Sequence, residues 1–374
     1  DMVRNFSLYI VISLLLQIIS CSKLNNMNGK YDWLTLTTAD MGYPMIINYG
    51  GFYNEKGEPI ASIPSNMELS SQWWSGDSGV MITGDDYKEI PMRMKIKWFS
   101  YAEDKFYEGD FVVDKERITQ LFDKGIEFNN PNNEYSKYPY IKVAIAPAGQ
   151  VYLYLEGGNN VLVGAFVAKE VFVDDFIREM RIRKEGVTRE ISVKSRIEDM
   201  PLQTQQEIAE NRISTQIWKD INLHYPWHYT FEIEDDKRPL LIQKENLGAN
   251  FINSESAWAV LPEFFTTTTP KAIPLEIDAN FETEAGRKLT VRIYPGNVNG
   301  KEPQYQTYEV QRVREQELVK LFKEFYKEIG SQEFAVHLKI SEDVKTAKVY
   351  LKKGKIEREI PNVEIQLFDT TFEK

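Results

Sequence analysis

Two stretches of the chain decide the fold: IPMRMKIKW at residues 90–98 and IPLEIDANF at residues 273–281. In each stretch an Ile-Pro pair is followed by alternation of apolar and polar side chains, which is the pattern of a β-strand with one buried face. The apolar positions are Met92, Met94, Ile96 and Trp98 in the first stretch and Leu275, Ile277, Ala279 and Phe281 in the second. The two patterns superimpose residue for residue, so we infer that the chain contains the same β-rich module twice.

The elements that follow each strand repeat in the same order. A hairpin-like stretch leads to one amphipathic helix in each copy, because apolar residues recur there with the spacing i, i+3, i+4. These residues are Ile118, Leu121 and Phe122 in the first copy, and Leu318, Leu321, Phe322 and Phe325 in the second. Asp114 is expected to cap the first helix. Alternating stretches then predict three more strands per copy, starting near Ile141 and Phe334.

The beginnings of the copies also match, with Tyr31-Asp32-Trp33 in the first and Tyr225-Pro226-Trp227 in the second. The predicted fold is therefore α+β: two modules, each mainly antiparallel sheet with one amphipathic helix, related by internal duplication. We place the first module at residues 30–190, a connector at 191–222 and the second module at 223–374. A helix over 204–222 is expected in the connector, and the charge-rich stretch 174–194 is expected to be a solvated ribbon.

The N-terminal residues have the layout of a bacterial lipoprotein signal. A weakly positive start is followed by the apolar run from Leu8 to Ile19, which is shorter than a bilayer span, and then by Ser20-Cys21. The only Cys of the chain stands where a lipobox requires a thiol to carry the lipid. We therefore expect residues 1–20 to be removed, Cys21 to be lipidated and residues 21–29 to form a tether. The expected location is the cell envelope, on the outer membrane and facing the periplasm.

Composition excludes several classes of function. The 374 residues include 45 Lys and Arg against 56 Asp and Glu, and the net charge of −11 repels phosphate backbones. We therefore expect no nucleic-acid partner. One Cys and three His are too few for a structural zinc site, and no internal disulfide can form. No metal and no cofactor are expected.

One family resemblance can be named. The stretch PMRMKIKWFS at residues 91–100, the residues EDKFY at 103–107, the helix at 118–122 and the stretch APAGQVYLYL at 146–155 resemble the domain-of-unknown-function family 2931. Its members are bacterial proteins, many of them described as lipoproteins, with no established activity. The resemblance covers roughly residues 30–170, and it implies no catalytic residues. The second copy departs from the family pattern, since Phe281-Glu282-Thr283 stands where Trp98-Phe99-Ser100 does.

Catalytic signatures are weak. Gly76-Asp77-Ser78-Gly79 is similar to the nucleophile turn of trypsin-like proteases, but all three His residues lie downstream of Ser78, which is the wrong order for that mechanism. His224 and His228 are four residues apart, yet Pro226 between them disfavours the helix of a zinc motif. We expect these two imidazoles to be partly exposed beside the start of a strand. His337 falls on the polar side of its strand and is expected to face solvent.

The differences between the copies indicate candidate binding loops. Leu121 and Ile141 are 20 positions apart, whereas Leu321 and Phe334 are 13 apart, and the extra residues are rich in Asn and Tyr, which suit adaptable recognition. The second copy has its own insertion around residues 295–303, and a Trp pair precedes Gly76. The candidate binding residues are Trp73, Trp74, Asn130, Asn132, Tyr135, Tyr138, Asn297 and Asn299.

The polar faces of the two marker strands differ in sign, with Arg93, Lys95 and Lys97 in one and Glu276 and Asp278 in the other. We expect these faces either to attract each other across the module interface or to leave the basic face for an anionic partner. The function indicated by the sequence is that of a lipid-anchored, non-enzymatic envelope protein that binds a protein or glycan, an immunity protein being one form. The alternative is an envelope hydrolase that uses carboxylates near residues 73–79 or Ser78.

Overall fold

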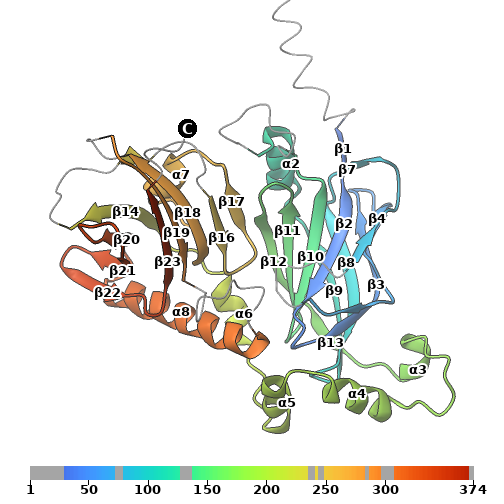
Figure 1. The fold of residues 1–374 in the computed structure, drawn as a ribbon. Coiled ribbons are helices and arrows are strands. Elements are labelled where there is room, and N and C mark those ends of the chain that lie inside the picture. The colour runs from blue at the N-terminus through green and yellow to red at the C-terminus, as the bar shows by residue number, and fades with distance from the viewer. Residues whose placement is uncertain are drawn as a thin grey trace, which may run out of the picture.

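The structure is a computed structural model, and it describes residues 29–71, 79–126, 137–234, 241–242, 248–282, 286–295 and 307–369. Most strands pair in antiparallel fashion, and helices are few (Figure 1). The predicted α+β class is confirmed. The strands form two groups along the chain, which we call the first unit (residues 30–171) and the second unit (residues 227–369).

The first unit consists of two main sheets. One sheet has the order β12-β11-β10-β2-β6, and the other has the order β13-β9-β8-β3-β4, with β5 also paired to β3. A short pair, β1 with β7, lies beside them. The bounds are β1 Lys30–Asp32, β2 Leu34–Ala39, β3 Met45–Tyr53, β4 Pro59–Ser62, β5 Glu68–Leu69, β6 Gly79–Met81, β7 Tyr87–Glu89, β8 Arg93–Ser100, β9 Lys105–Val112, α2 Lys115–Lys124, β10 Tyr140–Ala146, β11 Gln150–Glu156, β12 Val161–Val167 and β13 Lys169–Val171.

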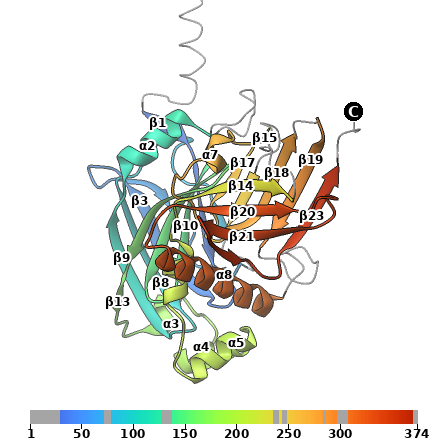
Figure 2. The same cartoon turned by 90° about the vertical axis from the view of Figure 1, so that its left-hand side faces the viewer.

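The second unit also has two sheets, with the orders β14-β20-β21-β22 and β17-β16-β18-β19-β23, and β15 pairs with β18. A 21-residue helix, α8, runs along this unit (Figures 1 and 2). The bounds are β14 Trp227–Ile233, β15 Leu241–Ile242, β16 Gly248–Phe251, β17 Ser256–Trp258, α7 Glu263–Thr266, β18 Pro274–Glu282, β19 Lys288–Tyr294, α8 Tyr308–Glu328, β20 Phe334–Ile340, β21 Ala347–Lys353, β22 Ile356–Glu359 and β23 Glu364–Asp369.

The two units share one connectivity. β2 pairs in parallel with β10, and β14 pairs in parallel with β20, while β11 and β12 then extend the first sheet as β21 and β22 extend the second. In the other sheets β3-β8-β9 corresponds to β16-β18-β19, and α2 and α8 occupy the same place in the order. For these strands the same order and the same pairing senses recur after Tyr31 and after Tyr225. Among the described residues, β6 beside β2 has no counterpart beside β14, and β15 pairs with β18 whereas β5 pairs with β3.

Local sequence explains the marker elements. β18 alternates between buried and half-buried residues from Leu275 to Glu282, and β8 alternates from Met94 to Trp98, as expected. Met92, the first apolar position of the first stretch, precedes β8 and is 40% exposed, so its predicted place on the buried face is wrong. The Asp114 carboxylate accepts a hydrogen bond from the Arg117 backbone N–H at 3.0 Å, so the predicted cap of α2 is confirmed. The helix predicted in the second copy is α8.

Helices α3 Phe176–Glu179, α4 Arg189–Glu198, α5 Leu202–Ala209 and α6 Gln216–Ile221 lie between the units. The single helix predicted over 204–222 is wrong, because Asn211 adopts a positive φ of 52° after α5 and the chain turns before α6 begins. The solvated ribbon predicted at 174–194 is also wrong. Phe176 and Val193 are buried and pack in one cluster with Phe99 and Phe106 of the first unit.

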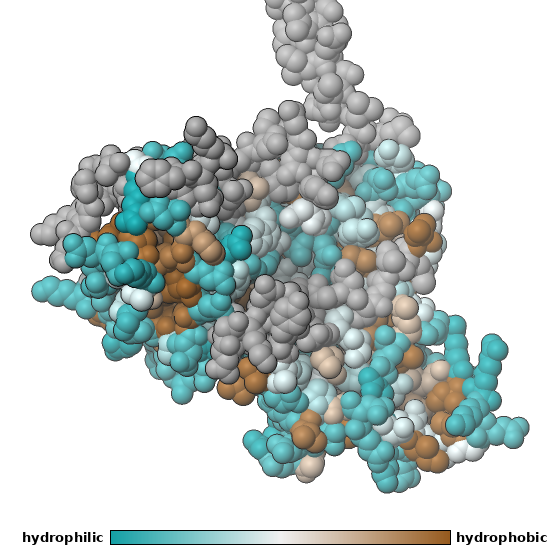
Figure 3. Space-filling view, in the orientation of Figure 1, coloured by the Kyte–Doolittle hydropathy of each residue, from teal (hydrophilic) through white to brown (hydrophobic). Residues whose placement is uncertain are grey.

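Polar residues dominate the described surface in Figure 3, with smaller apolar clusters between them. Some of these clusters lie on the arm formed by α3 and α4, at the lower right of the view. Phe172 at the base of this arm is 87% exposed, and Ile191 on α4 is 53% exposed.

The predicted attraction between the charged strand faces of the two units is wrong. Arg93 and Lys95 pair with Asp110 on the neighbouring strand β9, and Lys97 pairs with Glu179 on α3 at 2.6 Å. In the second unit Asp278 pairs with Arg292, also on an adjacent strand. Each face is thus neutralised mainly within its own sheet.

An equivalent buried lysine fastens the first strand of each unit. Lys88 and Lys271 each stand two residues before an Ile-Pro pair, and they are 4% and 2% exposed. The Lys88 ammonium donates to the Trp33 carbonyl at 2.8 Å, and the Lys271 ammonium donates to the Trp227 carbonyl at 2.7 Å. Each ammonium also lies over the ring of that tryptophan, at 5.6 Å and 4.9 Å from the centroid. We call each arrangement a lysine clasp.

The tyrosine two residues before each of these tryptophans completes the correspondence. Tyr31 is paired with Lys88 across β1 and β7, and Tyr225 forms an isolated bridge with Lys271. The Tyr31 ring contacts Phe122 of α2 with centroids 5.2 Å apart, and the Tyr225 ring contacts Phe322 of α8 at 5.8 Å. Strand, lysine and helix are therefore joined in the same way in both units.

Lys271 gives a prediction about pH. Burial lowers the pKa of Lys271 to about 8, whereas an unfolded lysine titrates near 10.4. Between these values the unfolded chain binds more protons than the folded chain, so stability gains with rising pH. Relative to Lys271→Met, the free energy of unfolding of the unsubstituted protein should rise by roughly 1–2 kcal/mol from pH 8 to 9.5. Urea unfolding at a series of pH values measures this, and parallel profiles for the two proteins would contradict it.

Candidate functional site

A cavity of about 400 Å³ lies between the two units. It is bounded by α2, the segment after it and β12 on one side, and by β17, α7 and the segment after α7 on the other. Its size is within the range of roughly 300–1,000 Å³ that is usual for ligand sites. Because residues of both units also line it, we take it as the candidate functional site.

The lining of the cavity is graded by depth. The buried floor consists of Ile126, Tyr138, Asn159 and Ala257. The half-buried walls include Leu121, Val161, Val260 and Phe264. The exposed rim carries Lys124, Leu261, Glu263, Thr267 and Thr269. An apolar group fits the interior of such a site, while polar atoms fit the rim.

The Asn159 amide on the floor bonds to the protein itself. The Asn159 amide accepts from the Trp258 backbone N–H at 2.6 Å and donates to the Trp258 carbonyl at 3.1 Å. Asn159 comes from the β11–β12 hairpin and Trp258 from β17, so this pair also holds the two units together. The floor of the cavity is thus part of the junction between the units.

Lys271 fixes the far side of the cavity. Besides the Trp227 carbonyl, its ammonium donates to the carbonyls of Thr267 at 2.8 Å and Thr269 at 2.6 Å, and it lies 5.6 Å from the ring centroid of Phe264. Thr267, Thr269 and Phe264 all line the cavity. The lysine clasp of the second unit therefore positions the segment that forms this rim and wall.

Of the sequence-predicted binding residues, Tyr138 lines the cavity, where it is 5% exposed and its ring packs against Phe122. Burial raises the pKa of Tyr138 to about 12, so its hydroxyl stays protonated at neutral pH. The other predicted binding residues, Trp73, Trp74, Asn130, Asn132, Tyr135, Asn297 and Asn299, lie outside the described residues, as do Ser78 and the predicted lipidation site Cys21.

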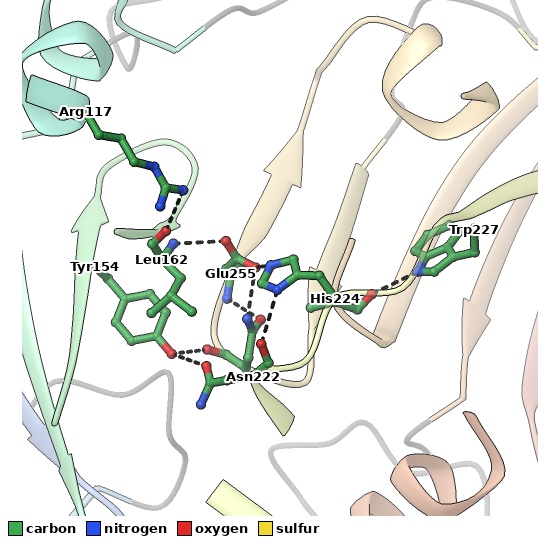
Figure 4. A network of polar contacts seen from close by, with 9 residues as sticks. Arg117, Tyr154, Leu162, Asn222, His224, Trp227 and Glu255 are labelled. Carbon is green, nitrogen blue, oxygen red and sulfur yellow. Dashed lines mark hydrogen bonds and ion pairs between the residues drawn. The ribbon is translucent and has the colours of Figure 1, made fainter. Parts of the chain in front are cut away.

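A polar network connects the units at the edge of β12 (Figure 4). The Glu255 carboxylate, 14% exposed, accepts from the Leu162 backbone N–H at 2.9 Å and contacts His224 Nε2 at 2.5 Å. The Leu162 carbonyl accepts from the Arg117 guanidinium at 2.9 Å. Side chains thus occupy the N–H and the C=O of Leu162 on an edge strand, which protects that edge from pairing with other strands.

His224 is committed to this network on both sides. Its Nδ1 contacts the Asn222 carbonyl at 3.1 Å, and its Nε2 contacts the Glu255 carboxylate, so both partners are acceptors and favour the doubly protonated ring. Burial disfavours the charged ring, but Glu255 and the Asn222 carbonyl outweigh burial and raise the pKa of His224. Neither ring nitrogen is free to accept a proton from a substrate, so this imidazole suits a structural role.

The other two imidazoles lie apart from the cavity. His228 is half-buried in β14, and burial lowers its pKa. His337 is only 5% exposed, so the expectation that it faces solvent is wrong. Its Nδ1 lies 2.8 Å from the Thr230 hydroxyl on β14. The sequence pattern marked a polar face correctly, but neighbouring side chains cover that face at His337.

A buried charged cluster joins the end of β2 to the first turns of α8. The Arg312 guanidinium pairs with Asp40 and, at 2.6 Å, with Glu315, and it lies 4.4 Å from the ring centroid of Trp218. The Tyr308 hydroxyl donates to Asp40 at 2.7 Å. All five side chains are less than 9% exposed. This cluster fixes α8 of the second unit against the first unit.

In this cluster the carboxylates of Asp40 and Glu315 share the single guanidinium of Arg312. The shared positive charge cannot fully stabilise both ionised carboxylates, which favours the protonated form of one of them. Burial raises the pKa of Glu315 to about 7, and Arg312 only partly offsets that effect. Sequence reasoning missed the cluster, because its members lie 272 positions apart between Asp40 and Arg312. It equally missed the lysine clasps, although the repeated Lys-x-Ile-Pro motif at 88–91 and 271–274 could have revealed them.

Glu315 gives a prediction with a defined sign. Because its folded pKa lies above the value near 4.3 of an unfolded glutamate, its contribution to stability is present at pH 4 and is lost as pH rises through 7. Glu315→Gln keeps an acceptor for Arg312 and cannot titrate. Relative to this variant, the free energy of unfolding of the unsubstituted protein should fall by roughly 2–3 kcal/mol between pH 4.5 and 7.5. Urea unfolding measures the difference, and identical pH profiles would contradict the assignment.

Among the described residues, no three His, Cys, Asp or Glu side chains are grouped so that they could hold a metal ion. No helix in the described part of the chain combines the length and apolar character needed to span a bilayer.

Comparison with known proteins gives one finding. The family model described as "Protein of unknown function (DUF2931)" matches residues 20–215, which include the first unit and most of the helical connector. No curated protein and no solved structure gives a significant match.

Proposed function

The chain belongs to the DUF2931 family of proteins of unknown function, and we propose that it is a lipid-anchored protein of the bacterial cell envelope that binds a partner without converting it chemically. The partner would place an apolar group in the cavity between the two units. The anchor would be a lipid on Cys21, on the outer membrane and facing the periplasm. An immunity protein that neutralises an effector acting on the envelope is one concrete form of this function.

The cavity is the observation that carries the proposal. Its floor and walls are largely apolar, it receives side chains from both units, and the buried Asn159 amide on its floor bonds to the Trp258 backbone. Apolar interior and polar rim suit the binding of a protein side chain or a lipid better than the binding of a glycan, whose many hydroxyls need partners.

The hydrolase alternative lacks a comparable observation. The carboxylates of Asp40 and Glu315 are buried and share Arg312, and both nitrogens of His224 are engaged. Ser78 and the carboxylates proposed near it lie outside the described residues. Binding is therefore the function that the described geometry favours.

We also propose that the two units arose by internal duplication. The support comes from the shared strand order, from the two lysine clasps and from the equivalent contacts of Tyr31 with Phe122 and of Tyr225 with Phe322. The units have since diverged, because among the described residues only the segment after α7 in the second unit places its backbone carbonyls around a clasp lysine and at a cavity rim.

The lipid anchor is tested by metabolic labelling. Cells producing the full chain with an alkyne-bearing fatty acid in the medium should give a labelled, membrane-associated protein. Cys21→Ser should abolish the label, because only a thiol accepts the lipid at this position. Ser20→Ala keeps a small residue before the Cys and serves as the control that retains the label. Equal labelling of the Cys21→Ser protein would contradict the anchor.

Partner binding is tested at the cavity rim. Leu261 is 44% exposed, so Leu261→Asp should leave the fold intact while placing a charge at the mouth of the site. Capture from native envelopes, followed by mass spectrometry, should show a specific partner that this variant loses by at least tenfold. Leu202→Asp on α5, where Leu202 is 69% exposed and remote from the cavity lining, is the matched control. Identical partners for all three proteins would contradict binding at the cavity.

A further inference from the structure

We propose that the apolar group bound between the units is a single acyl chain of a lipid. This inference rests on the proposed function and names the ligand class of the same cavity. Three observations carry it: the position of the cavity at the end of the molecule where the chain begins its first strand, the gradation of its lining, and the reach of the N-terminal segment.

The cavity lies beside the first strand of the fold. Figures 1 and 2 both show β1, α2 and α7 at one end of the molecule. The Tyr31 hydroxyl donates to Asp123 at 2.6 Å, and the Tyr31 ring contacts Phe122, whose ring lies 6.2 Å from that of Tyr138 on the cavity floor. A lipid held near the start of β1 is therefore close to the cavity.

The lining suits an acyl chain. Aliphatic side chains of Leu121, Val161 and Val260 and the ring of Phe264 form the walls, and such a chain needs only van der Waals contact along its length. At the rim, the Thr267 hydroxyl donates to the Glu263 carbonyl at 2.8 Å, and the Thr269 hydroxyl, 3.2 Å from that of Thr267, can donate to the ester or carboxylate oxygens at the polar end of a lipid. The site thus separates apolar from polar contacts in the order in which a lipid presents them.

Two sources can supply the chain. Cys21 precedes Tyr31 by ten positions, and an extended segment of that length spans up to about 35 Å, which allows a lipid on Cys21 to enter the cavity of its own molecule. A tether of this length also gives the attached chain a high effective concentration at the site. The other source is a phospholipid of the membrane. Both present the same acyl chemistry.

The first experiment uses the chain from Ser22 onward, without lipid. Every strand of the described structure pairs with another strand that lies after residue 29, so this chain contains all of the described fold. Titration with dansyl-undecanoic acid should show saturable binding. Val260→Trp, which fills the cavity from its wall, should weaken binding at least tenfold. Val310→Trp, at a 39%-exposed position on α8 outside the cavity lining, is the matched control and should bind normally.

Circular dichroism and thermal melting establish that both tryptophan variants fold. Absence of saturable binding by the unsubstituted chain, or equal binding by folded Val260→Trp, overturns the proposal. Neither result changes the outcome of the partner capture or of the Cys21 labelling, so failure of the acyl-chain proposal can be told apart from failure of the proposed function.

The second experiment identifies the source in the membrane-bound, full-length protein. A benzophenone amino acid at Leu261 should cross-link on irradiation to acyl carbon, and the same residue at Val310 should not. Mass spectrometry then shows either the lipidated N-terminal peptide or a phospholipid on residue 261, and each supports the acyl ligand with its own source. Cross-links from Leu261 only to protein side chains, or equal lipid cross-linking from Val310, overturn it.

Discussion

A buried ammonium group beneath a tryptophan carbonyl is the contact on which each unit depends. Lysine is rarely buried without compensation, because its charge loses water, and burial accordingly lowers the pKa of Lys271. The compensation is local: one or more backbone carbonyls accept from the ammonium, and an indole ring lies beside it. The clasp joins the first strand of each unit to the segment before the Ile-Pro strand.

The junction between the units uses a different principle. Charged and polar groups that are far apart in sequence are buried together, as in the Asp40, Arg312 and Glu315 cluster and in the His224–Glu255 pair. Such groups are costly when one partner is missing, so they specify one arrangement more strongly than apolar contacts do. The cavity exists because this arrangement holds β12 and α2 at a fixed position from β17 and α7. Its shape is therefore a property of the junction and of neither unit alone.

Periodicity in the sequence was enough to predict the marker strands, the helices of both units, the cap at Asp114 and the α+β class. These features depend on residues within a few positions of one another, so the sequence displays them directly. The cavity and the charged cluster could not be predicted, because they bring together residues far apart in the sequence, such as Ile126 and Ala257 in the cavity lining, that only the packing of the units places near one another. The prediction that His337 faces solvent was wrong for the same reason. A period of two identifies the face of a strand on which a residue lies, but it does not say what covers that face. The prediction of a solvated ribbon at 174–194 was wrong because the many charged residues in this stretch drew attention away from two apolar residues that become buried, Phe176 and Val193.

The extent of the family match bears on where the function resides. The match ends at residue 215, whereas half of the cavity wall comes from residues 256–269 of the second unit. In the first unit the clasp lysine donates to the Trp33 carbonyl, and the acidic residues near it are Asp32, Asp85 and Asp86. In the second unit the equivalent lysine, Lys271, also donates to the carbonyls of Thr267 and Thr269 and so positions the residues of the cavity rim. The lysine that fastens a strand in the first unit thus also positions the cavity rim in the second unit. Under the internal duplication proposed above, the cavity between the units would follow from divergence of the second unit, outside the residues that the family model matches.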